Sequence, residues 1–163
     1  MSKIYVDEIA GIASPSTVAI PGHVIQVVQT VSTTEATNTT TSYADTNLSA
    51  SITPTSSSSK ILITVVQGVM HNAGNANSGL GLRLLRDSTS IHGGVQRYEQ
   101  YIATGNSSNA QIYCKMPLSY LDSPNTTSEI TYKTQLATYD AGETARAQES
   151  GIQSTITLME IAG

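Results

Sequence analysis

The chain contains 163 residues, of which 39% are hydrophobic and 12% are charged, and its net charge is −4. Eight lysines and arginines are too few to neutralise a row of phosphates, which argues against a nucleic-acid partner. The single cysteine, Cys114, excludes an intrachain disulfide framework, and no stretch approaches the roughly 18 apolar residues that span a bilayer.

Hydroxyl side chains supply most of the polarity, with 21 serines and 22 threonines. Threonine suits a pleated, half-buried surface and serine favours turns, whereas the strong helix formers Lys, Glu and Arg are scarce. The eight tyrosines are the only large aromatic residues, and they suit sheet surfaces and interfaces. This composition favours β-strands, and the hydrophobic fraction is sufficient for a core.

Residues 1–22 differ from the rest of the chain and predict an extended N-terminal arm. Pro15 and Pro21 oppose a helix, and the segment is too short for a core of its own. We expect it to dock on another protein, although a partly ordered leader is the alternative. Asp7 and Glu8 interrupt any signal peptide, so we expect synthesis in a cytoplasm without export by that route. The predicted attachment residues are Ile4, Val6, Ile9 and Ile12.

From residue 23 onwards the chain shows regular strand signals. The segment HVIQVVQTV (23–31) is rich in β-branched residues, and Leu48, Ala50 and Ile52 alternate in the next apolar segment. Residues 53–60 contain Pro54 and a serine run and predict a loop. The nearly continuous apolar run at 60–69 predicts a strand that is buried on both faces.

The stretch MHNAGNANSG (70–79) predicts a long Gly/Asn loop, which we interpret as a flexible connection, with a receptor-binding tip as the alternative. Strands are predicted again over 81–87, 110–121, 128–139 and 152–161. The segment 98–104 is ambiguous between strand and loop. The residues of the possible receptor loop are His71, Asn72, Asn75 and Asn77.

These eight to ten short strands predict an all-β fold, an antiparallel β-sandwich of jelly-roll type over residues 23–163. No segment has a convincing helical period. Lys133 and Gln135 are expected on the solvent face of their strand. The predicted core residues are Ile61, Ile63, Val65, Leu82, Leu84, Ile112, Cys114, Met116, Ile130, Leu136, Ile156 and Leu158.

No arrangement of residues indicates catalysis, a metal or a cofactor. The histidines His23, His71 and His92 have no metal-ligand spacing and are each expected near an exposed loop. Cys114 is expected as a small buried hydrophobe. The glycine-rich loop lacks the Gly-Lys-Ser/Thr ending of a phosphate-binding loop. The stretch DAGETARAQES, with Asp140, Glu143 and Glu149, is predicted as a solvated loop, and a glycosidase-like carboxylate pair is the alternative.

Three blocks of sequence resemble a recurrent β-domain of tailed-bacteriophage virion proteins, common in tail-fibre-like and other appendage proteins of marine and cyanobacterial phages. They are SASITPTSSSSKILITV (49–65), GLRLLRDSTSI (81–91) with MPLSYLDSPNTTSEITYKTQ (116–135), and STITLMEIAG (154–163). The blocks occur in the family's order, and the resemblance covers about residues 22–163. It implies a virion location, a homotrimer and no catalytic residues.

The leader also resembles the junctions that precede such domains in phage fibres. Because this junction begins at Met1 with no shaft before it, we expect a short fibre, a capsid knob or a decoration protein. The partners are then other copies of the chain and other virion proteins of the capsid or tail. The alternative function is a tail-fibre adhesin that binds a host receptor or glycan through loops such as 70–79 and 105–109. A small glycan depolymerase is a third, disfavoured hypothesis.

Overall fold

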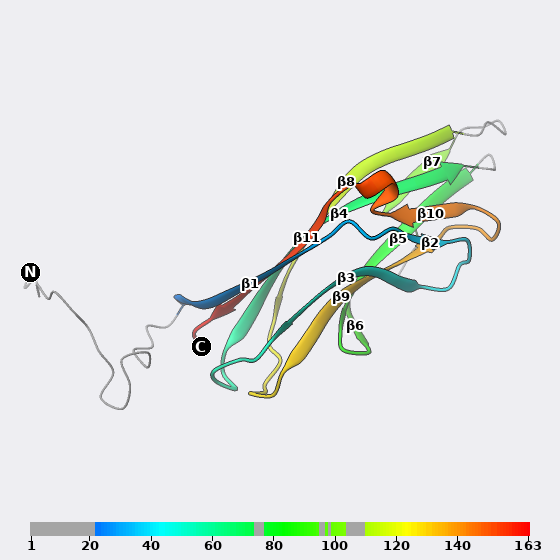
Figure 1. Cartoon of the computed structure of the whole chain (residues 1–163). Coiled ribbons are helices and arrows are strands. Elements are labelled where there is room, and N and C mark those ends of the chain that lie inside the picture. The colour runs from blue at the N-terminus through cyan, green and yellow to red at the C-terminus, as the bar shows by residue number, and fades with distance from the viewer. Residues whose placement is uncertain (1–21, 74–76, 95–96, 98, 104–109) are drawn as a thin grey trace, which may run out of the picture.

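The computed structural model describes residues 22–73, 77–94, 97, 99–103 and 110–163. Apart from a three-residue 3-10 helix, η2 (Glu149–Gly151), every helix or strand in these ranges is a β-strand. The strands form two antiparallel sheets that pack face to face (Figure 1). The expected all-β sandwich is therefore confirmed.

The larger sheet, called sheet A here, is organised around the long strand β4. One side of β4 pairs with β8 along its whole length, and the other side pairs first with β11 and then with β10. Strand β1 extends the sheet beyond β11, and β2 extends it beyond β10. The strands are β1 (Val24–Ser32), β2 (Ala36–Asn38), β4 (Lys60–Ala73), β8 (Ala110–Asp122), β10 (Thr144–Ala147) and β11 (Ser154–Ile161).

The smaller sheet, sheet B, has the order β3-β9-β5-β6. Strand β5 pairs with β9 on one side, and on the other side with β7 and then with β6. Segment 98–104, which the sequence left ambiguous, thus contains a short strand. The strands are β3 (Ala44–Ile52), β5 (Asn77–Arg86), β6 (Thr89–Gly93), β7 (Gln100–Ala103) and β9 (Ile130–Thr138).

The strand pairs are nested along the chain. The first strand pairs with the last, β3 with β9, β4 with β8, and β5 with the short strands that follow it. Strands β1 and β2, and likewise β10 and β11, belong to sheet A, whereas β3, β4 and β5, and then β8 and β9, alternate between the two sheets. A long antiparallel hairpin that is rolled up in this way is a jelly roll, so the expected topology is also observed.

The core forms where inward-facing positions of the two sheets meet. Along β4 the odd-numbered residues face inward, and Ile61, Ile63 and Val65 are fully buried. Between them Leu62 is half-buried and Thr64 is exposed, so the prediction that this part of β4 is buried on both faces was wrong. Its outer face is left open because nothing in the described part of the chain packs on it.

Nine of the twelve predicted core residues are buried. The exceptions are Ile112, Cys114 and Met116, which lie on the inner side of β8 but are only half-buried. Strand β8 is an edge strand, and the opposing sheet covers it incompletely. On β9, Tyr132 and Leu136 face inward, as expected.

The predicted arm, residues 1–22, lies outside the described residues except for Gly22. The Gly22 amide donates a hydrogen bond to the Ala162 carbonyl over 2.9 Å, and the Ala162 amide donates one to the His23 carbonyl over 2.9 Å. The chain therefore enters the sandwich beside its last residues, at the free edge of sheet A formed by β1.

Candidate functional site

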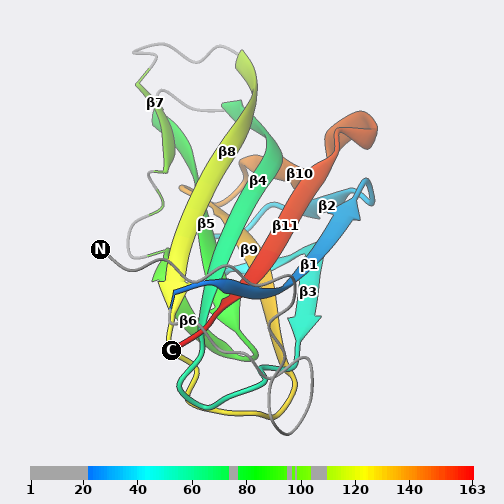
Figure 2. The ribbon, with the colours of Figure 1, turned by 90° about the vertical axis from the view of Figure 1, so that its left-hand side faces the viewer.

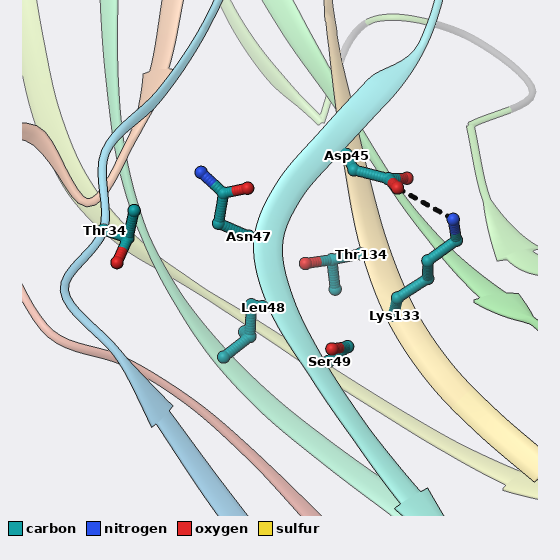
Figure 3. Close-up of a pocket in the computed structure, with 7 residues that line it drawn as sticks. All are labelled: Thr34, Asp45, Asn47, Leu48, Ser49, Lys133 and Thr134. Atoms are coloured by element: carbon teal, nitrogen blue, oxygen red, sulfur yellow. Dashed lines mark hydrogen bonds and ion pairs between the residues drawn. The ribbon is translucent and has the colours of Figure 1, made fainter.

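A polar hollow on the surface lies over the middle of β3, and Figure 3 shows the side chains around it. The hollow arises because β3 bulges: Asp45 pairs with Gln135, and Ser49, four residues later, pairs with Lys133. Asn47 sits in the bulge with a φ of 61°, a left-handed conformation that asparagine tolerates better than most residues. The lining residues are Thr34, Asp45, Asn47, Leu48, Ser49, Lys133 and Thr134.

The charged groups of the hollow already satisfy one another. Lys133 Nζ lies 2.8 Å from Asp45 Oδ2, and Gln135 Nε2 donates to Asp45 Oδ1 over 2.6 Å. Partial burial raises the pKa of Asp45, but these hydrogen bonds and the Lys133 charge outweigh it, so the pKa lies below its ordinary value. A nucleophile with an adjacent base is not among the lining residues. The hollow can offer hydrogen bonds to a ligand, not a reaction.

Beneath the hollow, a chain of buried hydrogen bonds crosses the sandwich. Thr46 Oγ1 lies 2.5 Å from Thr134 Oγ1, and the Thr134 hydroxyl donates to Gln67 Oε1 over 2.8 Å. Gln67 Nε2 then donates to Ser154 Oγ over 3.0 Å. All four side chains are buried. This series of hydrogen bonds thus links β3 and β9 of sheet B to β4 and β11 of sheet A.

This polar chain separates two hydrophobic clusters of the core. Gln67 stands on β4 between Val65 and Val69, which belong to different clusters. Likewise, Thr134 stands on β9 between Tyr132 of the larger cluster and Leu136 of the smaller one. The core is therefore two apolar regions with a hydrogen-bonded layer between them.

His71, Ser78 and Glu143 form a second buried polar group, near the other end of the sandwich. The Ser78 hydroxyl lies 2.5 Å from His71 Nε2, and Glu143 Oε2 lies 3.6 Å from the same nitrogen. The three residues are at most 1% exposed. Burial lowers the pKa of His71 below its ordinary value, and the Glu143 carboxylate offsets part of that effect.

These residue types match a catalytic triad, but their geometry does not. In a triad the carboxylate holds one ring nitrogen and the serine uses the other. Here both contact Nε2 of His71, and Nδ1 has no hydrogen-bond partner among the described residues. Full burial also denies a substrate access to the Ser78 hydroxyl. The group instead connects β4 and β5 to the loop that precedes β10.

Two further carboxylates hold strands together. Asp122 on β8 accepts hydrogen bonds from Arg86 over 2.9 Å and from the Tyr132 hydroxyl over 2.7 Å, both from sheet B. Burial, together with the Asp122 carboxylate, raises the pKa of Tyr132. Glu160 on β11 is fully buried and accepts from Gln26 and Thr55 over 2.6 and 2.7 Å. Burial raises the pKa of Glu160, but the hydrogen bonds outweigh it and the pKa is lowered.

The predicted receptor loop at 70–79 is largely strand, which corrects the expectation. Strand β4 continues to Ala73 and β5 begins at Asn77. His71 is fully buried and Asn72 is half-buried, so neither sits on an exposed loop tip. Asn77 lies at the start of β5, and Asn75 lies outside the described residues. The prediction failed because Gly and Asn suggested a loop, although His71 continues the inward alternation of β4.

The predicted attachment residues Ile4, Val6, Ile9 and Ile12 lie outside the described part of the chain, as do residues 105–109 of the second proposed loop.

The expectation of a solvated loop at DAGETARAQES was wrong for most of its length. The segment includes β10 and η2, and Glu143 is buried at 1% exposure. The short strand was missed because four residues give too little periodicity. The signal that was available is the pair Ala145 and Ala147, which alternate with polar residues and are fully buried.

The remaining candidate residues, His92 and Cys114, have surroundings that indicate a structural role. His92 stacks on Tyr120 with ring centroids 5.2 Å apart. Burial raises the pKa of the Cys114 thiol, which disfavours the reactive thiolate. Within the described ranges, no three His, Cys, Asp or Glu residues group closely enough to hold a metal. The same part of the chain contains no helix with the length and apolarity that a membrane crossing needs.

No protein-family model matches the chain, and no curated protein matches it. Among solved structures, the VP2 subviral particle of infectious bursal disease virus is 11% identical, with a TM-score of 0.40 over 84% of this chain and 38% of that one. Dimeric latent PorU from Porphyromonas gingivalis is also 11% identical, with a TM-score of 0.41 over 97% of this chain and 14% of that one. The chain therefore spans well under half the length of either protein.

Proposed function

We propose that the chain is a non-enzymatic structural protein displayed on a tailed-phage particle as a short fibre, a knob or a capsid decoration. In this proposal the N-terminal arm attaches it to another virion protein, and the jelly roll assembles with further copies of itself. The protein is made in the bacterial host and is located in the virion.

The observation that carries this proposal is the contrast between the two outer faces of the sandwich. On sheet B the outer face is ionic: Arg83, Gln135, Asp45 and Lys133 form one connected network. On sheet A, the outward-facing positions of β1, β11, β4 and β8 are apolar or uncharged polar residues over three successive rows. Depletion of charge is the compositional sign of the centre of a protein–protein interface.

The interior supports a structural role as well. The buried titratable groups His71, Glu143, Asp122 and Glu160 each connect strands through hydrogen bonds or an ion pair. None of these four combines access to solvent with a neighbouring nucleophile. His71, Glu143 and Asp122 hold the two sheets together, and Glu160 holds β11 to β1 and to the loop after β3, which suits a structural protein.

The sequence resemblance supports the phage assignment. The blocks 49–65, 81–91 with 116–135, and 154–163 include β11 and much of β3, β4, β5, β8 and β9, and they supply most of the larger hydrophobic cluster. The jelly roll is also a common architecture of viral capsid domains, although it occurs in lectins too. Fold-level analogy alone does not give a function. The blocks and the charge-free face together favour a virion component.

Particle labelling tests the proposed function. Purified particles of the virus that encodes the chain are expected to contain it at a fixed stoichiometry by mass spectrometry. Antibody labelling under the electron microscope is expected to mark a single class of position on the capsid or tail. Abundant chain in infected cells combined with its absence from purified particles would contradict the proposal.

Binding of a host surface glycan is the second candidate function, and the polar hollow over β3 favours it. Ser49 offers a hydroxyl on the same side of β3 as the Asp45–Lys133 pair (Figure 3). Asn47 lies on the other side of β3, where its amide donates to the Glu35 carbonyl over 3.0 Å. A glycan array probed with the purified protein tests this function, with Ser49→Ala as the informative variant and Ser51→Ala as its control on the same strand. If the wild type binds no glycan, or if both variants bind equally, the hollow has no such role.

A further inference from the structure

The outer face of sheet A carries three rows of side chains across the neighbouring strands β1, β11, β4 and β8. Figure 2 shows these four strands side by side in front of sheet B. The register of the sheet fixes which residues share a row. We call the rows the first apolar row, the polar row and the second apolar row. From β1 to β8 they are Val27, Met159, Leu62 and Leu121; then Gln29, Thr157, Thr64 and Ser119; then Val31, Thr155, Val66 and Pro117.

The side chains of these rows are exposed to solvent at both edges of the four-stranded face. Val27 and Val31 on β1 are 57% and 49% exposed, and Leu121 on β8 is 50% exposed. Between them Leu62, Val66 and Met159 are half-buried by their neighbours in the sheet. Lys60 and Lys115 lie on the same face but beyond the three rows. The result is an apolar surface with a central polar stripe.

We infer that this face packs against the same face of further copies of the chain, around a symmetry axis that runs along the strands. The inference rests on the part of the proposed function in which the protein assembles with further copies of itself. It is tested on the isolated protein, so its failure is distinguishable from a failure of the virion assignment, which particle labelling measures.

The pattern of the rows favours a copy of the chain over a different protein. An axis parallel to the strands keeps every row at its own height, so that each row meets itself in the other copy. The apolar rows then pack on apolar rows, and the hydroxyls of the polar row meet groups that donate and accept hydrogen bonds. Because the rows carry no charge, bringing identical faces together causes no like-charge repulsion within them. A symmetric oligomer needs this kind of self-complementarity.

The three rows cover about half of the area that a stable interface needs. Strands advance about 3.4 Å per residue and lie about 4.8 Å apart, so three rows on four strands present about 390 Å² in projection. A standard protein–protein interface buries about 800 Å² on each partner. The three rows therefore form the centre of the contact, and the residues around them supply the rest of its area.

The direction of the axis predicts which residues meet between copies. With an axis along the strands, β1 of one copy lies next to β8 of another, so Val27 approaches Leu121 of a different copy. Within one chain these two residues are three strands apart, about 14 Å, and a disulfide requires Cα atoms within about 7 Å. A disulfide between cysteines at both positions can thus form only between chains.

Cross-linking tests this geometry in a Cys114→Ser background, which removes the natural thiol. The double variant Val27→Cys with Leu121→Cys is expected to form covalent oligomers under mild oxidation. Each single variant is expected to stay largely uncrosslinked, because like positions are far apart around such an axis. Equal cross-linking of a single variant and the double variant, or none in the double variant, would overturn the inference.

Light scattering with a matched pair of variants tests the choice of face. Ser119→Glu places a charge in the polar row of sheet A, and Ser51→Glu places the same charge on the exposed face of sheet B. The wild type and Ser51→Glu are expected to be oligomeric at micromolar concentration. Ser119→Glu is expected to weaken association at least about tenfold. A wild type with the mass of one chain, or equal behaviour of the two variants, would contradict the inference.

Discussion

The Thr134 hydroxyl donates a hydrogen bond to Gln67 Oε1 over 2.8 Å and thereby joins the middle strands of the two sheets. Both residues occupy positions where the alternation of their strands places an apolar side chain two residues before and two residues after. The apolar core alone would tolerate a slip of one sheet over the other. A hydrogen bond requires a defined pairing, so this contact fixes how the two sheets are aligned.

Thr134→Val is expected to destabilise the protein, because it removes the hydroxyl at constant shape and leaves Gln67 Oε1 without its donor. An unsatisfied buried polar group costs about 1–3 kcal/mol. Thr131→Val on the same strand is the control, since Thr131 is only half-buried, and it should change stability by less than about 0.5 kcal/mol. Urea unfolding measures both values. Equal effects would mean that the buried hydrogen bond contributes nothing beyond packing.

Ile63→Ala and Leu84→Ala are each expected to lower the free energy of unfolding by about 2–5 kcal/mol. Both side chains are fully buried in the larger hydrophobic cluster, one from each sheet. Lys133→Ala removes a surface contact of Asp45, and Gln135→Ala removes surface contacts of Asp45 and Arg83, so each should cost less than about 1 kcal/mol. Chemical denaturation of the four variants compares them. Comparable losses in both pairs would show that the strand faces are assigned incorrectly.

The strands and their inner faces could be predicted where alternation is long and unbroken, as along β9 from Ile130 to Leu136. The polar layer was not predicted, because the residue types of Gln67 and Thr134 do not by themselves indicate buried hydrogen bonds. Their positions were nevertheless informative: Gln67 follows Ile63 and Val65 in the inward series, and Thr134 follows Tyr132. Position in the alternation was a better guide than residue polarity.

The buried group of His71, Ser78 and Glu143 could not be assembled from the sequence. His71 and Ser78 are brought together because β4 and β5 belong to different sheets that fold onto each other. Glu143 arrives from 65 positions beyond Ser78, on the loop before a four-residue strand. Only the pairing of β10 with β4 brings it to His71. Such long-range pairings depend on the topology, which local patterns do not encode.

The stability of the protein is expected to decrease as the pH falls below 6.5, the ordinary pKa of histidine. Burial lowers the pKa of His71 in the folded state, so the unfolded chain binds a proton more readily. The contribution of His71 is therefore complete above pH 6.5 and is lost as the pH falls towards its lowered folded value. Asp45 and Glu160 also have lowered pKa values, but their ordinary values are 3.8 and 4.5, so their effect begins at lower pH.

Urea unfolding of the wild type and His71→Gln as a function of pH isolates this contribution. The groups that face His71 are Ser78 and Glu143, and both remain in the variant. The variant is expected to lose less stability between neutral pH and about pH 5 than the wild type does. The comparison uses the slope of the free energy of unfolding against pH, so a destabilisation of the variant that is the same at every pH does not affect it. Identical slopes would contradict the prediction.

Deleting residues 1–20 is expected to leave a folded oligomer that no longer joins the particle. The first strand pairing of the sandwich joins Val24 to Ile161, so the deletion removes no described strand. Burying four apolar side chains of the arm on a partner contributes several kcal/mol at about 25 cal/mol per Å². Light scattering tests the fold and the assembly, and co-sedimentation with particles that lack the protein tests attachment. A full-length variant with serine at Ile4, Val6, Ile9 and Ile12 controls for chain length and should also fail to attach. Normal incorporation of both proteins would assign attachment to the sandwich.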